Sequence, residues 1–470
     1  MAYSDLRDFI GQVKDQDRLR VVEGADPYIE IGNITEVAAG LPECPALLFD
    51  KIKGVEPGFR ILSNVLTTPQ RAGLALGLDI KLSPVEMLKA WMARRQNLRR
   101  YEPIEVTDAP FLEHSDRDSD VDLGKFPAPV WHRGDGGPYI GTGALVVTKD
   151  PDDGWINASI YRLQVHSKDT ITVQFDTPAR HAAIIAKKYW DLGNPCPVAV
   201  VIGADPAFFI AGFESLPTGF SEYEFASSIK DAPIDICRGP LTGLPVPARA
   251  EMVLEGDFLP TTLVEGPFGE FTGYYTTEQR ACPIIKIKAV HYRDSPIILS
   301  SPPMKPPRAH MGLPFRSAAI WTHLKSSGIT DVVAVWQHVS SQVIVVALKQ
   351  RYDGHAQRAG LIAAAHAFMA RYVIVVDDDI DPTNLHDVMW AVATRSEPIE
   401  SIDIIRHGWS SILDPRISPE DKLAGVASHS KAIILACRPF RWLKAFPSSN
   451  VLSPEEIRLT KEKWRSVLQS

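Results

Sequence analysis

The sequence predicts a multidomain α/β protein of the α+β kind, with a β-rich central domain between two mixed regions. Two observations lead to this prediction. The chain has 470 residues, which is more than one domain usually holds. The patterns also change along it: helix and strand patterns mix up to about 110, short β-type runs dominate from about 140 to 300, and strands alternate with helices from about 315 to 440.

The N-terminal region, residues 1–115, is expected to be mixed α/β. The run PALLFDKI at 45–52 has the apolar character of a strand. Residues 82–100 predict an amphipathic helix, with Ser83 as its N-cap. A Pro- and Gly-rich junction at 123–143 then leads into the central domain.

The central domain, residues 116–310, is expected to be a barrel or a split sheet, because short β-type runs follow one another between turns rich in Pro, Gly and Asp. The runs are GALVVTK, WINASIYRLQV, TITVQFD, PVAVVIGA, ARAEMVLEG, PIIKIKAVHYR and PIILSS. One helix interrupts them at about 178–192, with Pro178 in its first turn.

The C-terminal region, residues 311–450, alternates strand and helix patterns. Such alternation is typical of an open, mostly parallel sheet covered by helices. Residues 451–470 contain the S-x-x-E pattern of a capping box and predict a terminal helix.

Composition excludes some classes of partner. The net charge of −7 argues against nucleic acid or an anionic membrane. The longest apolar runs, such as those at 197–204 and 372–376, are far too short to cross a bilayer, so no stable membrane insertion is expected. The N-terminus lacks the basic start and apolar run of a signal peptide, and the five cysteines form no C-x-x-C pair. A cytoplasmic setting is therefore expected.

The stretch EGPFGEFTGYY at 265–275 holds the main chemical signal. Glu265 and Glu270 lie on either side of a Pro-Phe-Gly turn, which Pro and Gly make stiff and tight. Arg162 lies in the middle of an apolar strand, where a buried guanidinium needs a carboxylate partner. The two glutamates are candidates for that partner.

A second group of polar residues suits a divalent cation. Asn157, His181 and Glu222 offer an amide, an imidazole and a carboxylate, which together fit Mn²⁺ or Mg²⁺. Each also has an ordinary explanation: a turn or edge residue for Asn157, a surface or capping residue for His181, and a helix-start glutamate for Glu222. Asn157 and Arg162 are five residues apart, so on a regular strand they face opposite sides and serve different parts of one site.

A third candidate is the acidic run of Asp377, Asp378, Asp379 and Asp381, which could bind a metal or could be a solvated strand end.

The sequence resembles the UbiD family of reversible decarboxylases, which use prenylated flavin mononucleotide (prenylated FMN). The resemblance extends over nearly the whole chain, and its N-terminal part is most similar to the bacterial hydroxybenzoate and vanillate decarboxylase branch. The motifs are DLRDFI, PALLFDKIKG, WHRGDGGPYIGTG, N-x-x-x-Y-R-x-Q-V, LPTGFSEYEFA, VPARAEMVLEG, EGPFGEFTGYY and VVDDDID. The most specific is the E-G-P-[FY]-G-[ED]-x-x-G-Y hairpin.

The resemblance implies a split-barrel flavin-binding domain between the N-terminal region and a C-terminal α/β domain. It also implies a homodimer or homohexamer assembled through the C-terminal part, and a prenyl-flavin synthase that supplies the cofactor.

The resemblance also implies roles for individual residues. Mn²⁺ (or Mg²⁺) would be held by Asn157, His181 and Glu222, and K⁺ by Ala211, Phe213 and Glu222. The prenylated FMN would be bound by Asn157, Ile160, Tyr161, Arg162, Gln174, His181, Glu222 and Lys431. The catalytic set would be Arg162, Glu265 and Glu270, with Glu270 as the proton donor and the other two positioning and tuning it.

The expected activity is the reversible, non-oxidative decarboxylation of an aromatic or heteroaromatic acid with release of CO₂. One alternative substrate class is an α,β-unsaturated or prenylated aromatic acid. An alternative of another class is a non-catalytic flavin-binding subunit, which the presence of both glutamates and Arg162 disfavours.

Pocket walls are expected from 173–180, from 302–312 and from the residues after Lys431. Within the second segment, a second polar group of the substrate could be read by Lys305, Arg308 and His310, or these could be plain loop charges.

Overall fold

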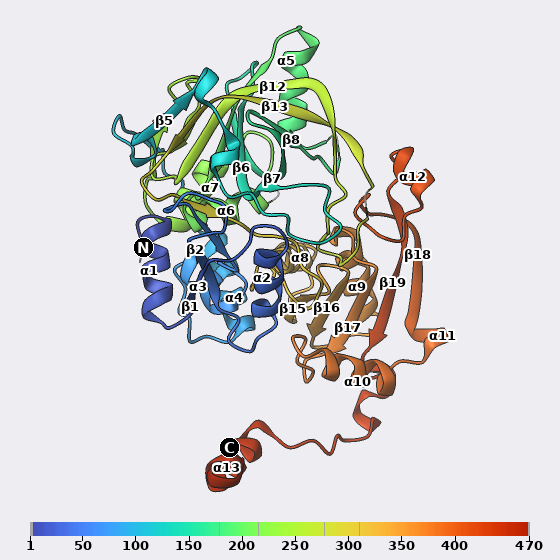
Figure 1. Ribbon diagram of the computed structural model, residues 1–470. Coiled ribbons are helices and arrows are strands. Elements are labelled where there is room, and N and C mark those ends of the chain that lie inside the picture. Colours follow the sequence, from blue (N-terminus) through green and yellow to red (C-terminus); the bar gives the residue numbers. More distant parts are fainter. Residues whose placement is uncertain (1–2, 178, 215, 277, 310, 469–470) are drawn as a thin grey trace.

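The computed structural model describes residues 3–468 apart from 178, 215, 277 and 310. Figure 1 shows a barrel in green and yellow, the N-terminal region in blue beneath it, and the C-terminal domain in orange beside both. The last helix stands away from the rest of the molecule.

The N-terminal region is a small mixed sheet with helices, as predicted. Its four-stranded sheet has the order β1-β2-β3-β14, and β14 comes from the end of the central domain, which ties the two regions together. The capping box of α4 is present between Ser83 and Glu86, although the helix ends at Arg95 rather than near residue 100. The elements are α1 (Leu6–Asp15), β1 (Leu19–Glu23), α2 (Glu30–Ala39), β2 (Ala46–Asp50), β3 (Arg60–Ser63), α3 (Pro69–Ala75), α4 (Pro84–Arg95) and β14 (Ile297–Leu299).

The central domain is a closed antiparallel barrel, which confirms the predicted barrel. Its strands follow the order β12-β9-β6-β7-β8-β13, and β13 pairs back onto β12. They are β6 (Tyr139–Lys149), β7 (Ile156–Ser167), β8 (Thr170–Val173), β9 (Cys196–Ile202), β12 (Met252–Glu265) and β13 (Arg280–Tyr292), and β5 (His114–Arg117) extends the sheet beside β13. The valines and the isoleucine of β9 are fully buried. Val198, Val200 and Ile202 pack in one apolar cluster and Val201 in another, so both faces of this strand are covered.

Short elements surround the barrel. They are β4 (Ile104–Glu105), η1 (Pro110–Leu112), η2 (Asp118–Asp120), η3 (Leu123–Lys125), α5 (His181–Asp191), α6 (Pro206–Phe213), α7 (Glu222–Lys230), β10 (Asp235–Arg238) and β11 (Pro245–Pro247). The helix expected from 178 begins only at His181, because the backbone of Arg180 is still extended. Pro178 lies outside the described residues.

The C-terminal domain has a five-stranded sheet in the order β15-β16-β17-β19-β18. The prediction of a mostly parallel sheet is wrong at both edges. Only β16, β17 and β19 are mutually parallel, whereas β15 and β18 run antiparallel to their neighbours. At one edge a short turn joins β15 to β16, and a short turn requires antiparallel strands. At the other edge β18 lies beside β19, to which it is connected through α12.

The elements of this domain are α8 (Phe315–Ser326), β15 (Val332–His338), β16 (Val343–Leu348), α9 (His355–His366), β17 (Tyr372–Asp377), α10 (Leu385–Arg395), α11 (Pro398–Ser401), β18 (Ile402–Trp409), α12 (Pro419–Leu423), β19 (Ser428–Ala436) and η4 (Phe440–Ala445). The predicted terminal helix is α13 (Pro454–Lys463), followed by α14 (Arg465–Leu468), and Ser453 and Glu456 form its capping box. Among the described residues, no helix has both the length and the apolar stretch needed to cross a membrane.

Candidate active site

Arg162 on β7 joins two carboxylates. Its Nε and Nη2 donate to the two oxygens of Glu265 at 2.8 and 3.0 Å, and its Nη1 donates to Oε1 of Glu270. Glu265 is the last residue of β12, and Glu270 lies in the loop that follows. Both glutamates are buried, and the Arg162 side chain is only 9% exposed. Both glutamates named as candidate partners of Arg162 therefore contact its guanidinium.

The two glutamates have different surroundings. Glu265 accepts a third hydrogen bond, from the Tyr139 hydroxyl at 2.8 Å. For Glu270, burial raises the pKa above the ordinary carboxyl value, although the Arg162 guanidinium acts in the opposite direction. Burial also acts to lower the pKa of Arg162, but the two carboxylates outweigh it and raise that pKa. Arg162 thus stays charged, and Glu270 is the carboxyl that holds a proton more readily than usual.

Aromatic rings complete the cluster. The Arg162 guanidinium lies 4.8 Å from the centroid of the Phe268 ring, and Phe268 packs on Tyr139 with 4.3 Å between ring centroids. Burial, followed by the neighbouring Glu265 carboxylate, raises the pKa of the Tyr139 hydroxyl, so it remains a donor. The Phe268 ring therefore largely excludes water from the face of the Arg162 guanidinium that it covers.

The loop between β12 and β13 is held by a second loop, from the WHRGDGGPYIGTG motif. Asp135 accepts hydrogen bonds from the backbone N–H groups of Gly269 and His132, both at 2.9 Å. The Gly136 N–H donates to the Pro267 carbonyl at 2.7 Å. A Cβ on Gly136 would lie 1.9 Å from the Gly266 carbonyl oxygen, so only glycine allows this approach.

Tyr139, Asp135 and Gln164 are site residues that the sequence reasoning did not single out. Gln164 accepts from the Gly266 N–H at 3.0 Å and thereby supports the start of the catalytic loop. All three lie inside motifs that the sequence shares with the UbiD family, and those motifs could have pointed to them.

Asn157 and Glu222 meet on a different side of the barrel from Arg162. The Asn157 Nδ2 donates to Oε1 of Glu222 at 2.9 Å, and the backbone N–H of Ala158 donates to Oε2 at 2.9 Å. Glu222 begins α7, with Ser221 as its N-cap. Asn157 and Arg162 thus contact different glutamates, and their division between two parts of one site stays a prediction.

Glu222 fits a cation site. It is 2% exposed, and burial raises its pKa against the effect of its neutral hydrogen-bond donors. Within the described residues, no Lys, Arg or His forms a salt bridge with it. A buried carboxylate without a cationic partner is costly, and a bound cation would remove that cost.

His181 is less closely joined to this pair. It begins α5, packs edge-on against Trp155 with ring centroids 4.9 Å apart, and lies 3.5 Å from the Thr218 hydroxyl. Burial, then the charge of Arg180, lowers its pKa, which favours the neutral imidazole that metals bind. No hydrogen bond joins His181 to Glu222 in the described part of the chain, and no group of three or more His, Cys, Asp or Glu able to hold a metal occurs there.

Of the three residues expected at K⁺, Ala211 and Phe213 belong to the last turn of α6, and Glu222 begins α7. The Ala211 carbonyl accepts from the Glu214 N–H at 3.1 Å, and Phe213 is 38% exposed. The Ala211 carbonyl therefore already has a backbone partner.

Arg162 and Glu270 open onto a small cavity of about 170 Å³. The expected residues Ile160, Tyr161 and Gln174 also line it. Of the segments expected as walls, 173–180 contributes most, and 302–312 contributes Pro303. From the C-terminal domain the wall residue is Leu413, not one of the residues after Lys431.

Lys431 does not lie at the cavity beside Arg162 and Glu270. Its ammonium donates to the carbonyls of Ala364 and Ala367 at 3.0 and 2.6 Å, at the end of α9, and it does not line this cavity. Burial lowers its pKa. The position of Lys431 here is that of a helix C-terminal partner.

The other charged candidates have ordinary partners. Arg395 pairs with Asp377 and Asp379, and Arg438 contacts Asp377 at 3.2 Å, so ion pairs neutralise these two carboxylates. Asp381 accepts from the Thr383 hydroxyl at 2.8 Å. Arg308 pairs with Glu36 at 3.2 Å. The side chain of Lys305 lies against Gly273 of the catalytic loop, and His310 lies outside the described residues.

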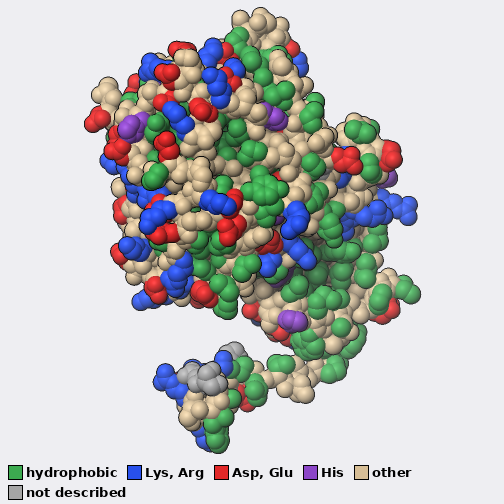
Figure 2. Space-filling view, in the orientation of Figure 1, with side chains coloured by type: hydrophobic (Ala, Val, Ile, Leu, Met, Phe, Trp, Pro, Cys, Tyr) green, Lys and Arg blue, Asp and Glu red, His purple; other side chains and the backbone are tan. Residues whose placement is uncertain are grey.

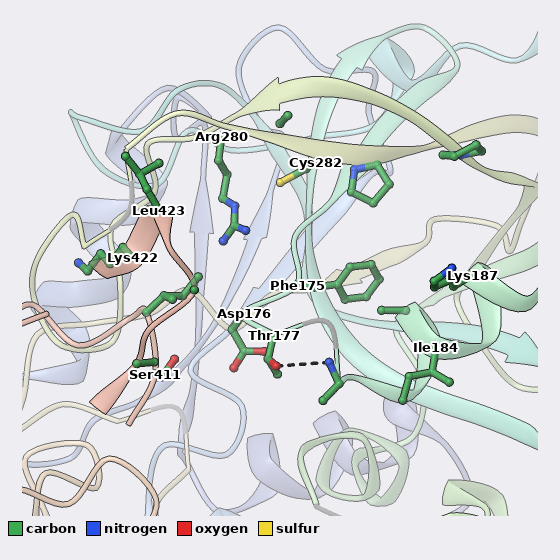
Figure 3. Close-up of a pocket in the computed structure, with 18 of the residues that line it drawn as sticks. Phe175, Asp176, Thr177, Ile184, Lys187, Arg280, Cys282, Ser411, Lys422 and Leu423 are labelled. Atoms are coloured by element: carbon green, nitrogen blue, oxygen red, sulfur yellow. Dashed lines mark hydrogen bonds between the residues drawn. The ribbon is translucent and has the colours of Figure 1, made fainter. Parts of the chain in front are cut away.

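A larger cleft of about 1210 Å³ lies beside the small cavity, between the barrel and the C-terminal domain (Figure 3). Asp176 lines both, so the cleft and the cavity adjoin. Asp176 forms a bidentate pair with Arg180 at 2.6 and 2.8 Å.

Family comparison agrees with this architecture. The 3-octaprenyl-4-hydroxybenzoate carboxy-lyase family, UbiD, has models for three domains: the N-terminal domain matches residues 10–94, the Rift-related domain 103–306 and the C-terminal domain 309–436. These matches cover most of the chain. The protein therefore belongs to the UbiD family of decarboxylases.

Solved structures of similar proteins cover nearly the whole chain. Vanillic acid decarboxylase of Sedimentibacter hydroxybenzoicus, in its open form with a truncated second component, is 29% identical, with a TM-score of 0.83 and 100% of both chains covered. HmfF of Pelotomaculum thermopropionicum in complex with FMN is 27% identical, with a TM-score of 0.86 and coverage of 97% and 99%. The 3,4-dihydroxybenzoic acid decarboxylase of Enterobacter cloacae is 26% identical, with a TM-score of 0.86 and coverage of 98% and 100%. An evolved dimeric form of HmfF is known with prenylated FMN.

Proposed function

We propose that this protein is a prenylated-FMN-dependent, reversible, non-oxidative decarboxylase of an aromatic or heteroaromatic acid. The observation that carries the proposal is the buried Glu265–Arg162–Glu270 cluster at the wall of a cavity. Similar proteins act on vanillic acid and 3,4-dihydroxybenzoic acid, and HmfF binds prenylated FMN, which supports both the substrate class and the cofactor.

In this mechanism Arg162 receives the substrate carboxylate. Its Nη1 now faces Glu270 alone, whereas Nε and Nη2 are held by Glu265. A proton on Glu270 weakens its ion pair and frees Nη1 for the incoming anion. Substrate binding and protonation of Glu270 therefore favour each other, since two carboxylates beside one guanidinium repel.

The bond from the substrate carbon to its carboxylate then breaks, CO₂ leaves, and the electron pair stays on the substrate. When bound, prenylated FMN would supply an electron sink that stabilises this pair until the carbon is protonated. Glu270 delivers its carboxyl proton to the carbon that lost CO₂ and becomes a carboxylate. In the reverse direction Glu270 takes that proton back. Glu265 and Tyr139 keep Arg162 in place throughout.

We assign the cofactor's phosphate end to the other side of the barrel. Glu222, Asn157 and His181 would hold Mn²⁺ (or Mg²⁺), whose charge would offset both Glu222 and the phosphate. K⁺ would take carbonyl oxygens near Ala211 and Phe213 together with Glu222, and Lys431 would approach the phosphate. Ile160, Tyr161 and Gln174 would contact the flavin.

The metal assignment has a direct test. His181→Ala should lose Mn²⁺ and flavin together, and wild-type protein stripped of metal should take up flavin only when Mn²⁺ and K⁺ are returned. Full flavin loading of metal-free His181→Ala protein would refute the assignment. His323→Ala, which changes an exposed side chain of α8, is the matched control and should keep both.

The main experiment is to produce the protein together with a prenyl-flavin synthase, record its flavin spectrum, and assay CO₂ release from a panel of acids. Release from benzoic or furoic acids supports the proposal. Release only from cinnamic or prenylated acids would move the protein to the alternative substrate class. Bound cofactor without any release would make it a flavin-binding subunit.

We also propose that the protein is a homodimer or homohexamer assembled through its C-terminal part. Exposed apolar side chains on α10 and α11, including Met389, Trp390 and Ile399, support this. Hydrophobic side chains gather over the C-terminal domain in Figure 2.

A further inference from the structure

The interdomain cleft of Figure 3 has two walls of different origin. Phe175, Arg280 and Cys282 come from the barrel and Ile184 from the adjoining helix α5. Ser411, Lys422 and Leu423 face them from the C-terminal domain. Arg280, at the start of β13, extends its guanidinium from the barrel wall into the open space. The cleft is about seven times the volume of the cavity at Arg162, from about 1210 and 170 Å³.

The charges of this cleft do not balance. Of its four basic side chains, Lys187 is neutralised by Asp191, and Lys188 by Asp150 and Asp152. Arg280 has no carboxylate within 4.0 Å among the residues that the structure describes. Among the described residues, the Lys422 ammonium donates one hydrogen bond, to a neutral group, the Thr276 carbonyl.

The acidic side chains do not compensate. Asp176 is held by Arg180, and Asp191 by Lys187. The cleft therefore carries a local positive charge, centred on Arg280 and Lys422, which favours an anion.

The apolar part of the lining favours a planar ring. Phe175 and Trp190 lie on the barrel wall, and Phe368 and Trp409 on the opposite wall. Aromatic faces bind flat ligands by stacking or edge contacts, and a guanidinium recognises a carboxylate with two parallel hydrogen bonds. An aromatic carboxylate meets both requirements at once.

The position of Arg280 relates the cleft to catalysis. Arg280 pairs in register with Glu265 across β12 and β13, so it stands beside the strand end that supplies a catalytic carboxylate. Asp176 lines both the cleft and the small cavity. An anion bound at Arg280 would thus lie in the cleft that adjoins the cavity at Arg162.

We propose that the cleft is an antechamber that binds the aromatic carboxylate substrate through Arg280 before it passes to Arg162. This inference rests on the proposed function. It makes Arg280 a specificity residue for capture of the substrate and gives it no part in the chemical step.

The kinetic test compares two single-charge variants of this cleft. Arg280→Gln should raise KM for a benzoate-type substrate by roughly 10- to 100-fold with kcat unchanged, because a charge-assisted contact is lost outside the chemical step. It should also reduce the dependence of kcat/KM on ionic strength. Lys187→Gln removes a charge that Asp191 already neutralises, and should leave both quantities within about twofold. Equal effects of the two variants, or a fall in kcat with KM unchanged, would overturn the proposal.

A binding test separates this proposal from the proposed function. Titration calorimetry of the cofactor-free protein needs no turnover, and the probes are benzoate, acetate and inorganic phosphate. Benzoate should bind wild type and Lys187→Gln and lose at least tenfold in affinity in Arg280→Gln, whereas acetate and phosphate should bind weakly. Phosphate binding as tight as that of benzoate would make the cleft a general anion site and overturn the substrate assignment. Suppose that Arg280→Gln loses benzoate binding and that the wild type releases no CO₂ from any acid. The proposal of a carboxylate site in the cleft would then stand, and the proposed decarboxylase activity would be rejected.

Discussion

At the scale of single residues, the cluster around Arg162 distinguishes two chemically identical side chains. Glu265 accepts from three donor groups: two on Arg162 and one on Tyr139. Glu270 accepts from one donor of the same guanidinium and is only 5% exposed. More donors favour the carboxylate form and burial favours the acid form, so the two glutamates suit different roles.

Glu270→Gln should slow decarboxylation by about 10² to 10⁴ while flavin stays bound, because the amide keeps the shape but cannot donate a carboxyl proton. In D₂O the wild type should exchange deuterium into the decarboxylated product at the carbon that bore the carboxylate, and Glu270→Gln should not. If Glu270→Gln exchanges at the wild-type rate and Glu265→Gln does not, the two roles are reversed.

The pH profile provides a second prediction. The groups that act on Glu270 are Arg162, which lowers its pKa, and Glu265 and Asp176, which raise it; burial dominates and the pKa is raised. A proton donor must be protonated, so kcat should fall as pH rises through this raised pKa, above the roughly 4.3 of an ordinary glutamate. Steady-state kcat between pH 5 and 9 measures this limb. A limb that persists unchanged in Glu270→Gln would assign it to another group.

Arg162→Lys tests the geometry of the guanidinium. Lysine keeps the charge but cannot make the paired contacts to Glu265 and reach Glu270 as well. We expect normal flavin content and a turnover lower by roughly 10- to 100-fold. Turnover near the wild-type value would mean that the substrate carboxylate is held by another side chain.

At the scale of elements, the catalytic loop depends on a partner loop more than a hundred residues earlier in the chain. Asp135 accepts from Gly269 and from His132, and its own side chain is fully buried. The loop after β12 is long and lies outside the strands, so these contacts determine where Glu270 stands.

Asp135→Ala should therefore impair catalysis without touching the substrate. Two backbone N–H groups lose their acceptor, at a cost of about 1–3 kcal/mol each, so the melting temperature should fall and kcat should fall with it. Asp122→Ala removes a similar turn contact, to the Gly124 N–H at 2.8 Å, far from the site, and should leave kcat unchanged. Thermal unfolding and turnover of the two variants check this. An Asp135→Ala protein with wild-type kcat would show that the loop is positioned without this carboxylate.

At the scale of the whole molecule, the terminal helix has no buried side chain among its described residues. Every side chain described from 455 to 468 is exposed, including the apolar Ile457, Trp464 and Val467. Figure 1 shows α13 apart from the C-terminal domain. Apolar side chains on an isolated helix favour association with another surface.

Removal of residues 451–470 should therefore lower the oligomeric state, measured by light scattering after size-exclusion chromatography, and leave the melting temperature of each protomer nearly unchanged. Lys461→Ser with Glu462→Ser changes the same helix at polar positions and should keep the wild-type mass. An unchanged mass after truncation would place the subunit interface elsewhere, for example at α10 and α11.

The sequence alone predicted the features that local chemistry encodes. The capping boxes at Ser83 and Ser453 form because a serine and a glutamate three residues apart satisfy free helix N–H groups without help from the rest of the chain. The need of Arg162 for a carboxylate followed from the cost of burying a charge. The three-part architecture followed from the changing periodicity of apolar residues.

Only the tertiary structure decided which side chains meet. Arg162 and Glu265 are 103 residues apart and come together because the barrel closes, and Lys431 lies against the end of α9, away from the cavity. The antiparallel edge strands, the contacts of Asp135 with the catalytic loop, and the lack of an ion pair for Arg280 within the described residues likewise have no local signal. Apolar periodicity indicates how each segment is buried, but contacts between distant segments depend on strand order and register, which are set by the packing of the whole domain.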